Sequence, residues 1–134
     1  MIRAEAVVKD SLTADPVVTI RPATLADFEH WHGGPPYQTV RAWVGLVDGR
    51  PVAFAGFTLH RSFVEAFSNF VPDHGLTKKC VYRYAKLMLA EMRKYRLPLM
   101  AAADPERQNS GKFLERLGFT FLEHSPTGDL YTCK

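Results

Sequence analysis

The longest hydrophobic pattern in the chain lies between Thr77 and Tyr95. Apolar residues recur there at steps of three and four, at Val81, Tyr84, Ala85, Met88, Met92 and Tyr95. Because a helix turns once in ~3.6 residues, this spacing places the apolar side chains on one face. Lysine and arginine occupy most of the remaining positions. The pattern therefore predicts a long amphipathic helix over residues 77–95.

Shorter runs of apolar and β-branched residues predict strands. Residues 40–47 and 52–58 flank Asp48-Gly49, a dipeptide favoured where a tight turn needs positive φ, and form the clearest hairpin. Further strands are predicted at 17–20, 63–71, 97–103, 119–123 and 130–133. Residues 1–15 have no decisive pattern, although 6–8 has the character of a short strand.

Two further helices have recognisable ends. Thr24 precedes a helix predicted over 25–32 and stands three residues before Asp27, which approximates a capping box. The run Gly33-Gly34-Pro35-Pro36 then ends that helix, because proline cannot continue the hydrogen-bonding pattern. The other helix is predicted over 106–117 and ends at Gly118, a residue that readily adopts the left-handed conformation of a helix end.

The order of these elements predicts the fold class. A helix between two strands implies a crossover connection, and the hairpins imply antiparallel neighbours. We therefore expect an α/β (α+β) fold, with a mixed, mostly antiparallel central sheet of six to seven strands and helices on both faces. The chain has 134 residues, of which 46% are hydrophobic. This suits a single domain over 1–134, with 1–16 as a loosely attached lead-in.

Charge and cysteine content narrow the expected partners and compartment. The net charge is +3, and Lys and Arg form no run longer than two residues, which disfavours a nucleic-acid partner. No window approaches the ~18 apolar residues of a membrane span, which disfavours a membrane partner. Two cysteines, Cys80 and Cys133, do not suggest a disulfide framework. We therefore expect a cytoplasmic protein that binds a small anionic ligand or a weakly acidic partner.

Four segments, in order, resemble the GNAT superfamily of N-acetyltransferases. The first is Ile20-Arg21-Pro22-Ala23-Thr24 with Asp27, and the second is the hairpin sequence VDGRPVAFAGF over 47–57. The others are Asp104-Pro105-Glu106 and the sequence FLERLGF over 113–119. The resemblance covers about residues 17–134 and implies the acyltransferase fold. The chain is also similar to short GNAT-like proteins encoded by tailed bacteriophages.

The resemblance implies a site for acetyl-coenzyme A. Members of the family hold its pyrophosphate on a loop of the form Q/R-x-x-G-x-G/A before the long helix. Here Gly75 takes the central position, while Pro72 and Thr77 replace the other two characteristic residues. The cofactor-binding residues implied by the resemblance are Asn69, Phe70 and Val71 for pantetheine, Gly75, Leu76, Thr77 and Lys78 for the phosphates, and Ser110 and Phe113 for the adenine side.

The implied catalytic residues depart from the family pattern. The family tyrosine that protonates the leaving thiolate corresponds to Leu114 here, and the frequent asparagine corresponds to Arg107. Leucine cannot transfer a proton, so Tyr131 is the nearest alternative acid. Glu65 lies where family members often carry the general base that accepts a proton from an amine. The other candidates for this base are Asp73, His74, Glu29, His30 and His32.

Other functions stay open at the level of sequence. The alternative hypothesis is that the protein keeps the fold without the reaction and acts as a binding, regulatory or virion-associated component with a protein partner. The fourth and fifth strands of the family correspond to those predicted here at 63–71 and 97–103. Side chains such as Phe70 and Met100 that fill the gap between them would favour that alternative. His30 and His32 lack a third ligand at helical spacing, so no metal is expected. A nucleic-acid role would require Lys78, Lys79, Arg83 and Lys86 to form one patch with Arg93 and Arg96.

Overall fold

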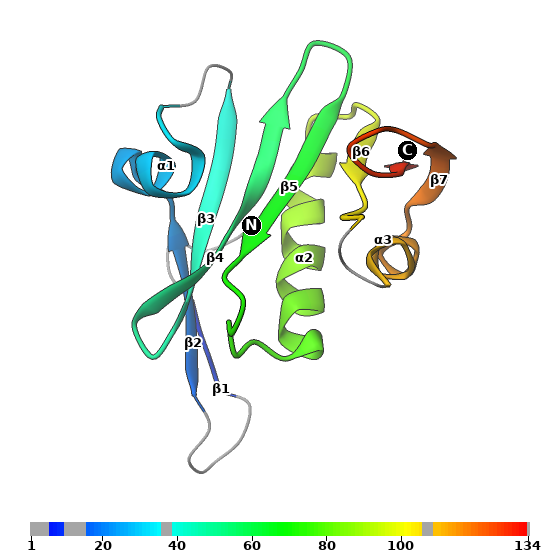
Figure 1. Cartoon of the computed structure of the whole chain (residues 1–134). Coiled ribbons are helices and arrows are strands. Elements are labelled where there is room, and N and C mark those ends of the chain that lie inside the picture. The colour runs from blue at the N-terminus through cyan, green and yellow to red at the C-terminus, as the bar shows by residue number, and fades with distance from the viewer. Residues whose placement is uncertain (1–5, 10–15, 36–38, 106–108, 134) are drawn as a thin grey trace.

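The computed structural model of the protein describes residues 6–9, 16–35, 39–105 and 109–133, which form eight strands and three helices (Figure 1). The strands are β1 (Ala6–Lys9), β2 (Val17–Pro22), β3 (Val40–Val47), β4 (Arg50–Leu59), β5 (Val64–Phe70), β6 (Leu99–Ala102), β7 (Thr120–Glu123) and β8 (Leu130–Cys133). The helices are α1 (Leu25–His32), α2 (Lys78–Arg93) and α3 (Ser110–Leu117). None of these helices is long and apolar enough to cross a membrane.

The described strands form one mixed sheet in the order β1-β2-β3-β4-β5-β6-β8-β7. Every neighbouring pair is antiparallel except β5 and β6, which are parallel. The predicted fold class is therefore confirmed. The sheet has eight strands rather than six or seven, because β1 pairs with β2 along its whole length.

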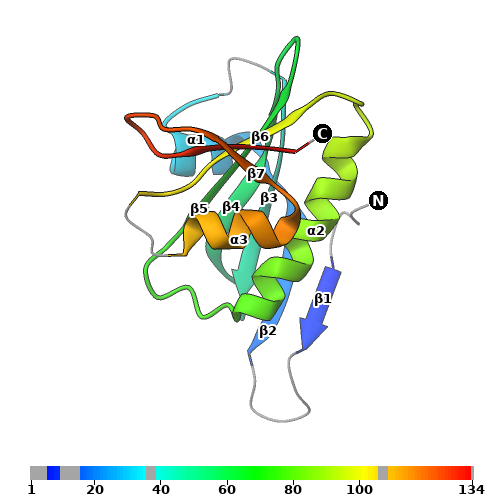
Figure 2. The same ribbon diagram turned by 90° about the vertical axis from the view of Figure 1, so that its right-hand side faces the viewer.

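Helices cover both faces of the sheet, as predicted (Figures 1 and 2). On one face, Phe28 of α1 packs against Val44 and Phe54. On the other face, Leu89 and Met92 of α2 belong to the largest cluster of buried side chains. Residues alternate between the faces along β3 and β4, so both strands contribute to both cores.

Two local predictions are confirmed at atomic detail. Asp48 and Gly49 both adopt positive φ, at 49° and 80°, in the turn between β3 and β4. At the start of α1, the Thr24 side chain accepts a hydrogen bond from the Asp27 main-chain N–H, while the Asp27 carboxylate accepts one from the Thr24 N–H. The predicted capping box is therefore complete.

Helix boundaries differ from prediction at two places. The helix α3 begins at Ser110 rather than at residue 106, because Asn109 stands before it with φ of 70°. Residues 106–108 lie outside the described part of the chain. The helix α2 is capped at Thr77 and ends at Arg93, two residues before the predicted end at Tyr95. Tyr95 therefore lies beyond the helix, and its ring contacts the ring of Phe57.

Candidate functional site

The sheet divides between β5 and β6. These strands pair at two positions, Val64 with Leu99 and Glu65 with Met100. The Val64 N–H also donates to the Pro98 carbonyl at 2.9 Å. Beyond Glu65, β5 continues to Phe70 without further pairing to β6, and the strands separate (Figure 1). We call this gap the splay.

The main chain of β5 presents one edge to the splay. Successive residues of a strand direct their N–H and C=O groups alternately to the two neighbours. Val64 directs its N–H to the β6 side, whereas Val71 donates to Val52 on the β4 side. The main-chain N–H and C=O groups of Ser68 and Phe70 therefore face the splay. Within the described chain, the main chain of Ser68 has no strand partner on that edge. Asn69 directs its main chain to β4.

The side chains of Phe70 and Met100 do not meet across the splay. Phe70 points to the α2 face, where it packs with Val71 against a cluster that contains Cys80. Met100 lies in register with Glu65 and therefore points to the α1 face. The plug that would have favoured loss of the reaction is not formed by this pair.

The loop before α2 uses its own side chains to satisfy its main chain. The His74 Nδ1 accepts a hydrogen bond from the Leu76 N–H at 2.9 Å. The Thr77 hydroxyl accepts one from the Cys80 N–H at 3.1 Å and so caps the helix. Gly75 has φ of 76°, which suits glycine. One N–H group of the sequence-predicted phosphate site, that of Leu76, is thus already engaged, and so is the Cys80 N–H in the first turn of α2.

Positive charge remains at the start of α2. Lys78 and Lys79 are both exposed in its first turn, and that turn has no acidic residue. Lysine there opposes the helix dipole, so an anion would improve the local electrostatics. To use the Leu76 N–H as well, a phosphate would have to replace the imidazole of His74.

Glu65 forms a pair with a histidine that the sequence did not indicate. The His60 Nε2 lies 2.8 Å from Glu65 Oε1. The His60 ring stacks on the Phe63 ring with centroids 4.2 Å apart, and the main-chain N–H of His60 donates to the main-chain carbonyl of Phe63. The ring is therefore held in place beside the carboxylate. Glu65 itself is exposed and stands at the narrow end of the splay.

Tyr131 lies on the opposite face of the sheet from Glu65. It is opposite Ala101 in the ladder and is 8% exposed. Its hydroxyl lies against Gly111 of α3, where a β-carbon would collide with it. Within the described chain this hydroxyl forms no hydrogen bond. The structure thus separates the two predicted catalytic residues, and both could act on one group only through the splay.

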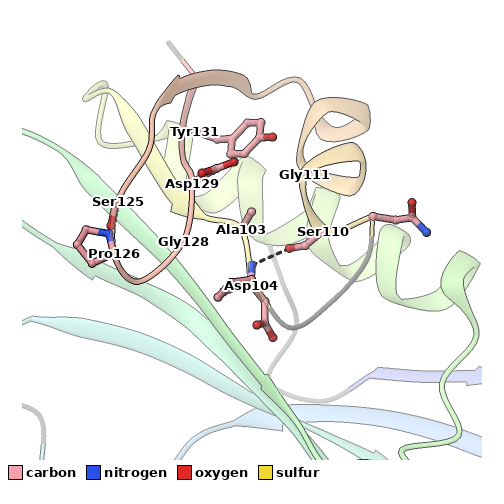
Figure 3. Close-up of a pocket in the computed structure, with 11 residues that line it drawn as sticks. Ala103, Asp104, Ser110, Gly111, Ser125, Pro126, Gly128, Asp129 and Tyr131 are labelled. Atoms are coloured by element: carbon pink, nitrogen blue, oxygen red, sulfur yellow. Dashed lines mark hydrogen bonds between the residues drawn. The ribbon is translucent and has the colours of Figure 1, made fainter.

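A pocket of about 320 Å³ lies beside the carboxyl end of β6 (Figure 3). The segment that follows β6, the start of α3, the β7–β8 connection and β8 line it, through residues that include Asp104, Ser110, Asp129 and Tyr131. The Ser110 hydroxyl accepts a hydrogen bond from the Asp104 N–H at 2.9 Å, which ties α3 to the end of β6. Ser110 therefore belongs to this pocket. Phe113 instead packs edge-on against Tyr82 of α2.

Comparison with known proteins identifies the fold. No protein-family model matches the sequence, and a search of curated protein sequences finds no match. Among solved structures, an uncharacterized protein from Bacillus halodurans matches with a TM-score of 0.66 and 13% identity, covering 98% of this chain and 90% of that one.

Two named acetyltransferases are similar in structure. The ribosomal-protein-S5-alanine acetyltransferase from Vibrio fischeri has a TM-score of 0.61 and 14% identity, covering 93% of this chain and 94% of its own. The aminoglycoside acetyltransferase AAC(6')-Ib, solved in complex with coenzyme A, has a TM-score of 0.59 and 13% identity, covering 86% and 92%. At this identity the likeness establishes the GNAT fold alone.

Proposed function

We propose that the protein binds acyl-coenzyme A in the splay and transfers its acyl group to an amine. The observation that carries this proposal is the open main-chain edge of β5 at Ser68, within the fold of N-acetyltransferases. An unpaired strand edge presents N–H and C=O groups that can pair with other amides, and the amides of pantetheine have the right chemistry. The phosphates would then lie toward Gly75–Lys78, with Ser110 and Phe113 on the adenine side.

The chain offers residues for the proton transfers. Acyl-coenzyme A, when bound, would supply the acyl group as a thioester, and coenzyme A would leave as the thiol. Glu65, at the narrow end of the splay, would accept the proton that the attacking amine loses. His60 would hold one oxygen of that carboxylate and leave the other for the amine. Tyr131 is the candidate donor to the departing sulfur, because Leu114 cannot serve.

Substitution of Ser68 tests the binding site. Ser68→Pro removes the N–H that faces the splay, and the sheet tolerates proline where no ladder hydrogen bond is lost. Ser68→Ala keeps the main chain and is the matched control. We expect calorimetry to show weaker binding of coenzyme A to Ser68→Pro than to the wild type, and no change for Ser68→Ala.

Two results would contradict the proposal. One is the absence of both binding heat and a thermal shift for the wild type at millimolar coenzyme A, since a ligand of the native state must stabilise it. The other is equal affinity of Ser68→Pro and Ser68→Ala, provided that circular dichroism shows both to be folded.

A second candidate function is binding without catalysis, with the GNAT fold retained as a scaffold. The observation that favours it is that His74 engages the Leu76 N–H of the loop before α2, while Thr77 engages the Cys80 N–H of the first helical turn. On this account the wild type does not bind coenzyme A, but His74→Ala, which releases the Leu76 N–H, does. Binding by the wild type that His74→Ala fails to strengthen contradicts this candidate.

A further inference from the structure

The exposed surface of α2 is strongly basic. Its exposed residues are Lys78, Lys79, Arg83, Lys86, Leu87, Ala90 and Arg93, of which five are cations and none is acidic. The acidic residue of the helix, Glu91, is 1% exposed. Its carboxylate contacts Arg41 at 3.3 Å and Lys94 at 2.7 Å, so it does not neutralise the exposed cations.

The fold aligns four of these cations. Lys79, Arg83, Lys86 and Arg93 are separated by four, three and seven residues, which places them on one side of the helix. At a rise of ~1.5 Å per residue they extend over about 21 Å. Basic residues that are separated in the sequence are therefore aligned along one side of α2.

A second helix extends this surface. Lys112 and Arg116 are exposed one turn apart on α3, beside a single exposed carboxylate, Glu115. The two helices pack together through Tyr82, whose hydroxyl donates to the Arg116 carbonyl at 3.3 Å, and they lie on the same face of the sheet (Figure 2). We call Lys79, Arg83, Lys86, Arg93, Lys112 and Arg116 the basic face; it contains four of the six residues that a nucleic-acid role required at the sequence level, with Lys112 and Arg116 in place of Lys78 and Arg96.

Among the helices, Lys and Arg are therefore confined to the α2 and α3 side of the sheet. On the opposite face, α1 contains neither lysine nor arginine. Within the described chain, Lys79, Arg83 and Lys86 form no ion pair. Lys79 and Arg83 are like charges one turn apart, which disfavours a helix. A polyanion laid along α2 would relieve that repulsion.

We propose that the basic face binds the phosphate backbone of double-stranded DNA, without regard to sequence. Duplex DNA presents regularly spaced phosphates to such a line of cations. The face has no fully exposed aromatic ring on which unpaired bases would stack, since Tyr82 and Phe113 are half-buried. Leu87 is its one large exposed apolar residue, which is too little for a membrane-bound helix or the core of a protein interface.

Fluorescence anisotropy with a labelled duplex of mixed sequence and ~20 base pairs tests this proposal. At low salt we expect the full chain to bind with a micromolar Kd. The logarithm of the affinity should fall linearly with the logarithm of salt concentration, by ~0.9 for each phosphate contacted. Contact with four phosphates gives a slope of about −3.6.

The variants compare one exposed arginine with another. Arg83→Gln should weaken binding and reduce the slope by ~0.9, whereas Arg83→Lys should preserve the slope. Arg61→Gln removes an exposed arginine from the β4–β5 turn, makes the same change in net charge, and should leave affinity unchanged. The triple variant Lys79→Gln/Arg83→Gln/Lys86→Gln should abolish binding and remain folded, because these side chains are exposed.

Four outcomes would overturn the proposal. They are no anisotropy change at low salt, an equal loss of affinity for Arg61→Gln and Arg83→Gln, competition by polyglutamate as strong as that by unlabelled duplex, and competition by micromolar coenzyme A. Polyglutamate competition would assign the face to an acidic protein. Competition by coenzyme A would assign the cations to the acyl-donor site.

Discussion

Individual contacts fix the position of Tyr131, which we proposed as the alternative acid. Its ring lies edge-on to Phe121 and its hydroxyl lies against Gly111 in the first turn of α3. A β-carbon at residue 111 would overlap that hydroxyl, so α3 can approach β8 this closely because residue 111 is glycine. The close packing of α3 on β8 thus depends on both Tyr131 and Gly111.

We predict that Gly111→Ala destabilises the protein by about 1–3 kcal/mol through overpacking. The double variant Gly111→Ala/Tyr131→Phe should recover much of that loss, because it removes the colliding oxygen. Urea unfolding of both variants measures the difference. Equal stabilities for single and double variants would show that the hydroxyl is not the source of the strain.

A second contact at this scale depends on pH. Asp27 is 9% exposed and receives hydrogen bonds from Arg21 at 2.6 and 3.0 Å and from the Thr24 N–H at 2.7 Å. The Arg21 hydrogen bonds, above all, lower the pKa of Asp27 from 3.8 to about 2. A carboxylate with a lowered pKa stabilises the folded state above its unfolded pKa and loses that contribution as the pH falls through the folded value.

We predict that Asp27→Asn lowers the free energy of unfolding at pH 7 by about 1–2 kcal/mol. The difference between wild type and variant should stay constant down to about pH 4 and shrink toward pH 2. Chemical denaturation at a series of pH values measures it. A difference that is independent of pH down to 2 would exclude the ion pair as its cause.

At the scale of elements, the start of α2 combines a good cap with an unfavourable charge. Thr77 supplies the cap, while Lys78 and Lys79 oppose the dipole. The helix forms nevertheless, because Leu89 and Met92 bury its other face. Tertiary packing therefore outweighs a local electrostatic cost that leaves the first turn suited to an anion.

We predict that Thr77→Ala lowers the free energy of unfolding by about 1 kcal/mol through loss of the cap. Thr77→Asp keeps an acceptor for the Cys80 N–H and adds a favourable charge, so it should be at least as stable as the wild type. The same carboxylate should weaken coenzyme A binding if phosphates lie there. Thermal melts with calorimetry separate the two effects, and a destabilised Thr77→Asp would contradict the capping account.

What the sequence predicted at this scale is local. The turn at Asp48-Gly49 and the capping box at Thr24 follow from residues within a few positions of one another, and both are present. The hydrogen bond between His74 and Leu76 also joins residues that are close in sequence. The orientation of the His74 ring, however, depends on its packing against Phe70. Closeness in sequence was therefore not sufficient to predict this hydrogen bond.

What the sequence did not predict depends on tertiary placement. Which neighbour the main chain of Ser68 faces depends on the strand pairing and is not visible in the sequence, which placed the pantetheine contacts at residues 69–71. Glu65 was a candidate without a partner until the β4–β5 turn brought His60 to it. Charges that read as scattered become aligned once α2 buries Glu91 and exposes its basic residues.

At the scale of the whole molecule, two cores share one sheet. Trp43 is buried on the α2 face beside Phe57, while Trp31 stacks on Phe54 on the α1 face, with ring planes within 8°. Because β3 and β4 contribute alternate residues to both cores, neither core can lose its strands while the other remains. The two layers should unfold together.

Two single-tryptophan variants test this cooperativity. In Trp31→Phe the fluorescence reports the α2 face, and in Trp43→Phe it reports the α1 face. We predict that within each variant the fluorescence and far-ultraviolet circular dichroism transitions in urea coincide, as a two-state transition requires. Separate midpoints in either variant would show that one layer melts independently.

The splay has a consequence for the response of this molecule to temperature. With ladder pairing at two positions, the strands β6, β8 and β7 are joined to the rest of the sheet chiefly by side-chain packing under α2. Hydrophobic packing weakens on cooling, whereas the hydrogen-bonded ladders elsewhere in the sheet depend on it less. We therefore expect this seam, rather than the termini of the helices, to loosen first near freezing.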